Sequence, residues 1–147
     1  MRHMMWWTFG GIAFVAVIGL VFLGTLGGTW QTVRDGIQTV TIPQSWKRRH
    51  AAPGTVWFVS PRNHNTWVWL GQLTRTPFVP GSRAQRIPAP QPGLVEWQAA
   101  TTSNHVPVLS FYGLYHHARQ YWAIHIEVPA NQLTLGSQIL GSWQPFS

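Results

Sequence analysis

The stretch that decides the fold of this chain is QYWAIHIEV, at positions 120–128. Side chains of two kinds alternate along it, and a period of two residues is typical of a β-strand. One predicted face of this strand carries Tyr121, Ala123, His125 and Glu127, and the other carries Trp122, Ile124, Ile126 and Val128. The surrounding domain is therefore expected to consist of β-strands.

The segments around this strand support the same interpretation. Runs rich in β-branched and aromatic residues occur at 38–42, 55–59, 66–73, 94–100 and 107–113, with turn-forming residues at 60–65 and 101–105. The pattern predicts a basic loop at 47–54, a proline-rich loop or edge at 75–93 and one helical turn at 114–119. We expect a small all-β domain, a sandwich or barrel of about six to eight short strands.

A different pattern precedes the domain. No Lys, Arg, Asp or Glu occurs from 4 to 30, a range that includes IAFVAVIGLVFLGTL at 12–26. About 20 apolar residues in a helix span the hydrocarbon core of a bilayer, so a single transmembrane helix is predicted, with a brief extension toward Gly36. A cleaved signal peptide is the alternative. The predicted division is an anchor with a short tail at 1–34, a juxtamembrane strand and basic loop at 35–54, and an extracytoplasmic β domain at 55–147.

The anchor carries a candidate docking motif. Gly24 and Gly28 have the GxxxG spacing that lets two membrane helices approach closely, although glycine is also tolerated in such helices without any role. A count of Lys and Arg near the two ends, taken literally, favours a cytoplasmic domain. The short, positive N-terminal tail and the cysteine-free, acid-poor domain favour the opposite orientation. We expect a single-pass protein of the inner (cytoplasmic) membrane with a periplasmic C-terminal domain.

The composition excludes several kinds of chemistry. Cysteine is absent, which excludes disulfides, thiolate zinc sites, iron–sulfur clusters and cysteine nucleophiles. Ten Lys and Arg against three Asp and Glu give a net charge of +7, but only 47–49 is a basic cluster, so no nucleic-acid partner is expected. A domain with few carboxylates has little stability to lose in acid, which suits an acidic compartment; compositional drift explains the same scarcity.

Histidines are the candidate metal ligands. A copper or haem site needs two or three converging imidazoles, and His64 and His105 with either His116 or His117 form a conceivable set. Their spacing matches no metal-binding motif. Isolated histidines on the surface or in hydrogen bonds are therefore the favoured interpretation, with no cofactor.

Tryptophans are the remaining signal. Trp57, Trp97 and Trp122 are predicted to lie in the core. Trp67, Trp69 and Trp143 are candidates for a protein interface, with the core as the alternative.

Catalysis is not expected. Only the carboxylates Glu96 and Glu127 lie in the domain, and each is expected to pair locally. No GxSxG or phosphate-binding glycine loop is present.

These features favour a non-catalytic, single-span accessory subunit of a larger membrane complex, of a respiratory or electron-transfer kind. Its expected partners are integral membrane subunits and the lipid bilayer. An anchor followed by a β domain resembles cytochrome oxidase subunit II in layout only, since the copper-binding cysteines are missing and no site residue is transferable. The alternatives are a histidine-based copper or haem module and a domain that binds envelope glycans or lipids through its tryptophans.

Overall fold

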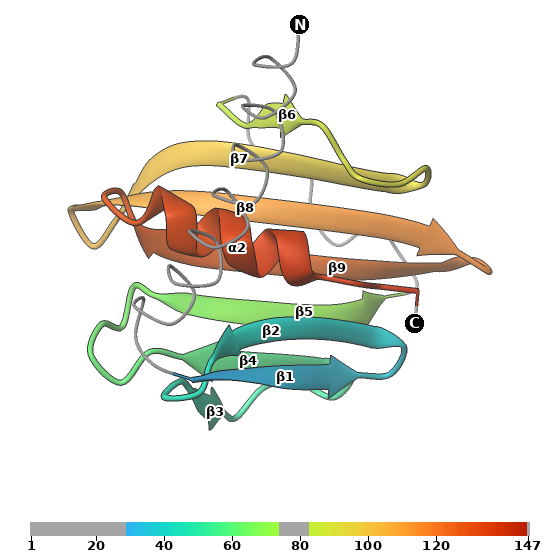
Figure 1. Cartoon of the computed structure of the whole chain (residues 1–147), viewed down its shortest axis with the longest axis horizontal. Helices are drawn as coiled ribbons and strands as arrows, with labels where there is room; N and C mark the ends of the chain where they lie inside the picture. The colour runs from blue at the N-terminus through green and yellow to red at the C-terminus, as the bar shows by residue number, and fades with distance from the viewer. Residues whose placement is uncertain (1–28, 74–82, 147) are drawn as a thin grey trace, which may run out of the picture.

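The computed structural model describes residues 29–73 and 83–146. Within them, seven strands form one antiparallel sheet in the order β3-β4-β5-β9-β8-β7-β6. Its strands are β3 (Lys47–Arg49), β4 (Thr55–Val59), β5 (Trp67–Leu73), β6 (Gln85–Ile87), β7 (Leu94–Ser103), β8 (Val106–His117) and β9 (Gln120–Pro129). A second sheet is the hairpin of β1 (Trp30–Asp35) and β2 (Gln38–Pro43), and one helix, α2 (Leu133–Ser142), follows β9 (Figure 1).

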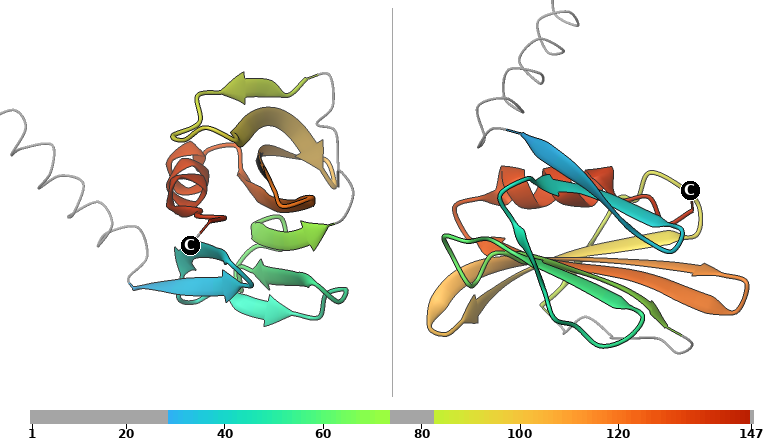
Figure 2. Two further views of the ribbon diagram at one scale, coloured as in Figure 1. Left: turned by 90° about the vertical axis from the view of Figure 1, so that its right-hand side faces the viewer. Right: turned by 90° about the horizontal axis from the view of Figure 1, so that it is seen from below.

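The hairpin and α2 lie on the same face of the large sheet, and we call this the covered face (Figure 2). The core fills the space between these layers. It includes Ile42 of β2, Leu70 of β5, Ile124 and Ile126 of β9, and Ile139 of α2, each no more than 1% exposed. Burial of side chains of this size contributes about 1.5–3 kcal/mol each, so this contact holds the domain together.

Two tight turns order the longest strands. Asn104 and His105 join β7 to β8, and Ala118 and Arg119 join β8 to β9, all four with positive φ between 51° and 67°. Two residues in this conformation form the hairpin turn whose twist matches that of the strands it joins. The helical turn predicted at 114–119 is wrong, because β8 continues to His117 before this turn.

The expectation of a small all-β domain is confirmed, with two sheets of antiparallel strands. Within the described residues, the large sheet does not close on itself, since β3 and β6 are its two edges, and the second sheet has only two strands. Helix α2 was not predicted, and it covers the sheet beside the hairpin. Part of the predicted basic loop pairs with β4 as β3, and the proline-rich stretch supplies the edge strand β6.

Of the predictions for the N-terminal part of the chain, one is tested by the described residues and the other lies outside them. Residues 30–35 form β1, so the predicted extension of the helix toward Gly36 is wrong. Gly36 instead turns the chain with φ +60°, and a Cβ there would lie 3.1 Å from the Trp122 ring. The predicted anchor at 12–26 and its Gly24 and Gly28 lie outside the described residues. In the part of the chain that the structure describes, no helix is long and apolar enough to cross a membrane.

A buried polar link joins the layers. The indole N–H of Trp143 donates to Gln38 Oε1 at 3.0 Å, and the Gln38 amide donates to the backbone carbonyl of Gly71 at 3.0 Å. Trp143 is 3% exposed and Gln38 is fully buried. The prediction of Trp143 as an interface residue is therefore wrong, because its ring belongs to the core.

Candidate functional site

The face of the large sheet opposite α2 carries no described helix or strand (Figure 2). One row of side chains crosses this open face at right angles to the strands, because each member is the direct register partner of the next. From β3 to β6 the row consists of Arg49, Trp57, Trp69, His125, Tyr112, Trp97 and Arg86. We call it the aromatic row. Neighbouring strands lie about 4.8 Å apart, so the row is about 29 Å long.

Two rings in the middle of the row stack on each other, and a third ring beside the row contacts one of them. His125 stacks on Tyr112 with ring centroids 4.2 Å apart, and the ring of Trp67 meets His125 edge-on at 4.6 Å. Burial lowers the pKa of His125 to about 4, because an imidazolium would lose its hydration there. His125 is thus neutral at neutral pH, and the centre of the row is uncharged.

Gly71 lets Trp69 lie against the sheet. A Cβ at Gly71 would sit 2.4 Å from Cη2 and 2.6 Å from Cζ2 of Trp69, which is closer than real atoms approach. The indole ring therefore lies over the glycine, two residues along the same strand face. A ring in this position presents apolar surface to a ligand at little conformational cost.

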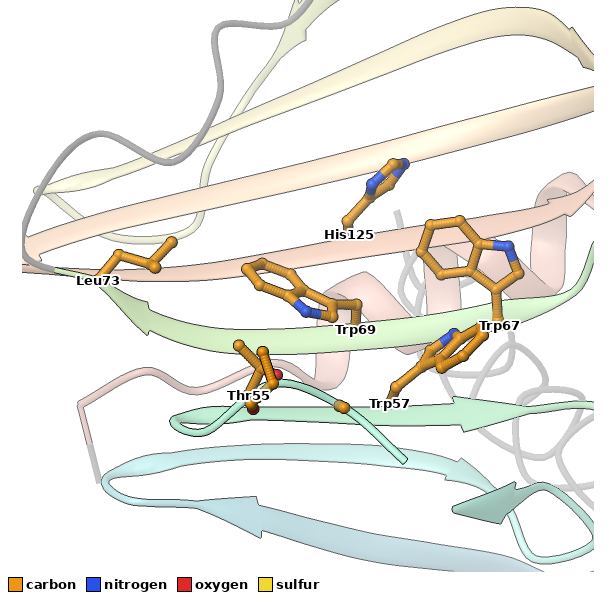
Figure 3. A pocket seen from close by; sticks show the side chains of 8 residues that line it. Thr55, Trp57, Trp67, Trp69, Leu73 and His125 are labelled. Carbon is orange, nitrogen blue, oxygen red and sulfur yellow. The ribbon is translucent and has the colours of Figure 1, made fainter. Parts of the chain in front are cut away.

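Beside Trp69 the open face is hollowed, with a volume of about 710 Å³ (Figure 3). The lining consists of Ala51, Ala52, Thr55, Trp57, Trp67, Trp69, Leu73 and His125. This size falls in the range of small-ligand pockets and is also sufficient for a side chain of a partner protein.

Charge is distributed unevenly around this hollow. Its nearest carboxylate, Glu127, is 8% exposed and accepts a hydrogen bond from the Trp67 indole N–H at 3.0 Å. Burial raises the pKa of Glu127, and this hydrogen bond opposes the rise. Glu96 alternates with Trp97 along β7 and so faces the covered side. The open face therefore combines a neutral aromatic centre with exposed guanidinium groups at Arg49 and Arg86.

The structure agrees with some of the predicted positions of the tryptophans, in the core or at an interface, and not with others. Trp67 and Trp69 are half-buried on the open face, as an interface would require. Trp122 is in the core as predicted, at 6% exposure. Trp57 and Trp97 are half-buried members of the row, so their assignment to the core is wrong.

Six of the seven members of the row, all but Trp69, were not recognised from the sequence as site residues. Besides the two tryptophans that were assigned to the core, these are Arg49, Arg86, Tyr112 and His125, which alternation alone places on one strand face or the other. The missing signal is strand register, since only the pairing of all seven strands aligns these residues.

The four candidate metal ligands do not come together. His64 lies in the β4–β5 loop and His105 in the β7–β8 turn, whereas His116 and His117 occupy the other end of β8. His116 lies eleven residues beyond His105 along the chain, a distance of about 35 Å in a strand. His116 stacks on Tyr121 at 4.4 Å, and His117 faces the opposite side of the sheet. Across 29–73 and 83–146, no three His, Asp or Glu side chains cluster as a metal site would require.

Fold and site define this as an antiparallel sheet domain with one covered and one open aromatic face. No protein-family model matches the chain, and no curated protein does. Among solved structures, the chain is similar to cyanobacterial PsbP (CyanoP) from Synechocystis sp. PCC 6803, with 12% identity and a TM-score of 0.52 over 82% of this chain and 95% of that chain. A protein from Bacteroides thetaiotaomicron VPI-5482 has 9% identity and a TM-score of 0.52 over 81% of this chain. The match spans about half, 48%, of the Bacteroides chain. At these identities the likeness concerns the fold alone.

Proposed function

We propose that this protein is a non-catalytic accessory subunit of a larger membrane complex, of a respiratory or electron-transfer kind. In this proposal the N-terminal segment holds it in the inner membrane, and the aromatic row is the surface through which the periplasmic β domain binds its partner.

The observation that supports this proposal is the composition of the aromatic row. It joins Trp, Tyr and Arg side chains in one line, and these are the residues enriched at the energetic centres of protein interfaces. Exposed carboxylates, which interfaces tend to exclude, do not occur on the described part of this face.

The matching partner surface follows from the row. An apolar or aromatic side chain of the partner would enter the hollow beside Trp69, and carboxylates would meet Arg49 and Arg86 at the two ends. The central contact would supply most of the affinity, because rim charges add chiefly association rate and specificity.

The test uses the full-length protein, extracted from its native membranes in a mild detergent and then sized. Co-purification of a defined subunit is expected, with its loss in the Trp69→Ala and Tyr112→Ala variants. The control is Leu133→Ala, because Leu133 is 48% exposed on α2, on the other side of the sheet. Migration as a monomer without any co-purifying subunit would sink the proposal.

A second candidate function is binding of an envelope glycan, favoured by the position of Trp69 over Gly71. An indole ring that lies against a sheet offers a platform for the apolar face of a sugar ring. Such binding needs no protein partner, so quenching of tryptophan fluorescence by glycan fragments on the purified protein distinguishes the two functions. Unchanged quenching in Trp69→Ala would exclude this site.

A further inference from the structure

The chain enters the described part of the domain at one end of the large sheet. Its first described residue, Thr29, is held there, because its carbonyl accepts the backbone N–H of Gln44 at 3.0 Å. The β4–β5 loop, the β7–β8 turn and the start of α2 lie at the same end, and the β8–β9 turn lies at the opposite end (Figure 1). We call the first of these the entry end.

The loops of the entry end contact one another and form one surface. The Ser103 hydroxyl donates to Asn65 Oδ1 at 3.4 Å, which joins β7 to the β4–β5 loop. The backbone N–H of Ala130 donates to the carbonyl of Pro107 at 3.1 Å, which joins the segment before α2 to β8. Whatever lies beyond this end therefore meets all three loops together.

The length of chain before Thr29 determines what the entry end faces. This step rests on the proposed function, in which the apolar run at 12–26 lies in the membrane. Thr29 follows Leu26, the last residue of that run, by three residues. Even fully extended, three residues span at most about 11 Å. The polar layer on each side of the hydrocarbon core is about 5–8 Å thick, so Thr29 lies within or close to the lipid headgroups, and the entry end faces them.

Exposed apolar side chains gather at the same end. The large hydrophobic residues that are most exposed among the described ones are Leu133 at 48% and Val106 at 41%. Leu133 begins α2, and Val106 begins β8 directly after the β7–β8 turn. Single exposed hydrophobic residues are common on protein surfaces, but side chains of this kind beside a bilayer can bury themselves at its interface.

The formal charges of this end are positive. Arg62 is exposed in the β4–β5 loop, and Lys47 is exposed beside that loop, because it pairs with the last residue of β4. The three acidic residues of the sequence oppose them little: Asp35 lies at the opposite end, beside the β1–β2 turn, and Glu96 and Glu127 are only 5% and 8% exposed. Near an anionic membrane, each Lys or Arg adds about a fivefold gain in affinity.

We propose that the entry end binds the anionic headgroups of the membrane that its own N-terminal segment enters. Arg62 and Lys47 contact the phosphates, and Val106 and Leu133 insert among the headgroups. The strands then lead away from the membrane, and the aromatic row crosses β8 seven residues beyond the β7–β8 turn, up to about 24 Å from the headgroups. A detergent extract contains no bilayer, so Leu133→Ala remains a suitable control for binding by the row.

The test uses a single introduced cysteine as the site of a fluorophore, since the sequence has no cysteine of its own. Asn104→Cys labels the entry end, and Ala118→Cys labels the opposite end. The two positions are matched, because both are exposed and each begins a two-residue turn, with φ 51° and 52°. The labelled full-length protein is reconstituted into vesicles of phosphatidylcholine, with or without phosphatidylglycerol, that carry a nitroxide quencher on the headgroup.

Quenching should be at least about threefold stronger at position 104 than at position 118, because the twelve residues of β8 separate the two labels by about 40 Å. It should also be stronger at position 104 when phosphatidylglycerol is present. Thr134→Cys, exposed in the first turn of α2, gives a second label at the entry end that avoids the turn backbone, and it should behave like position 104.

Paired variants test the charge. Arg62→Gln should remove the additional quenching that phosphatidylglycerol causes at position 104, and Arg86→Gln, which removes a guanidinium from the aromatic row, should not. Equal quenching at the two ends, or equal quenching at position 104 in both membranes, would overturn the proposal.

A wash of the vesicles with alkaline carbonate separates this proposal from the proposed function. Protein that the wash removes has no membrane-spanning segment, a result that would overturn both. Protein that is retained but not quenched at positions 104 and 134 would overturn only the binding of headgroups by the entry end.

Discussion

Replacement of Glu96 by Gln should stabilise the protein at high pH and leave its stability in acid unchanged. Glu96 is 5% exposed on the covered side of the sheet, opposite Gly113. Burial raises the pKa of its carboxyl from 4.5 to about 7, because the charged form loses its hydration. A raised carboxyl pKa means that the folded state holds the proton more tightly than the unfolded chain does.

The sign and the size follow from linkage. The contribution of Glu96 is complete below pH 4.5 and is lost as pH rises through 7. A shift of this size corresponds to about 3 kcal/mol. Gln resembles the protonated acid at every pH, so the variant avoids this loss: the gain over the wild type is about 3 kcal/mol at pH 8 and close to zero at pH 4.

His125 acts in the opposite direction. Its pKa is lowered from 6.5 to about 4, so its stabilising contribution is complete above pH 6.5 and is lost as pH falls through 4. Between about pH 4.5 and 6.5 in the wild type, the stability that Glu96 loses as pH rises is largely offset by the stability that His125 gains. In Glu96→Gln the free energy of unfolding should therefore fall as the pH is lowered, because His125 is still present and nothing offsets it. The double variant with His125→Phe should not show this fall.

The assay is urea unfolding of the full-length protein in detergent, followed by tryptophan fluorescence from pH 4 to pH 8. The measured quantity is the free energy of unfolding at each pH. An equal difference between variant and wild type at pH 4 and pH 8, or a loss of stability at pH 8, would refute the reasoning.

Three further substitutions test other parts of the structure. Gly71→Ala should displace the Trp69 ring, cost about 1–3 kcal/mol of stability and weaken partner or glycan binding; unchanged urea unfolding and binding would contradict the contact. Gln38→Leu should cost about 2–5 kcal/mol in urea unfolding, since the indole N–H of Trp143 and the Gly71 carbonyl are left buried without partners, and a cost below about 1 kcal/mol would count against this link. Arg119→Gly should raise the free energy of unfolding by about 0.5–1 kcal/mol, because φ +65° suits glycine, and destabilisation would argue against the turn.

Alternation along β9 was sufficient to predict a strand and to separate its two faces. Trp122 and Ile126 indeed face the core, and His125 faces away from it. The same rule failed on β4, where TVWFV is apolar on both faces. A period of two says which residues share a face, but it does not say which face another layer will cover.

Helix α2 shows a second limit. LTLGSQILGS contains Gly136, a weak helix residue, and the N-cap lacks a strong capping side chain. Its helical state depends on tertiary packing: a Cβ at Gly136 would lie 2.2 Å from Cε2 of Phe111, so the helix rests directly on this ring of the sheet. A contact between residues 25 positions apart leaves no local signal.

The sequence by itself determined the chemistry that the domain lacks and the β character of its longest segments. Absent cysteines and rare carboxylates are properties of composition, and the period of two is local. Only the tertiary structure decided that Arg49, five aromatic rings and Arg86 form one row, and that Trp143 belongs to the core. The physical reason is register: hydrogen bonds between strands distant in sequence align side chains that no local pattern relates.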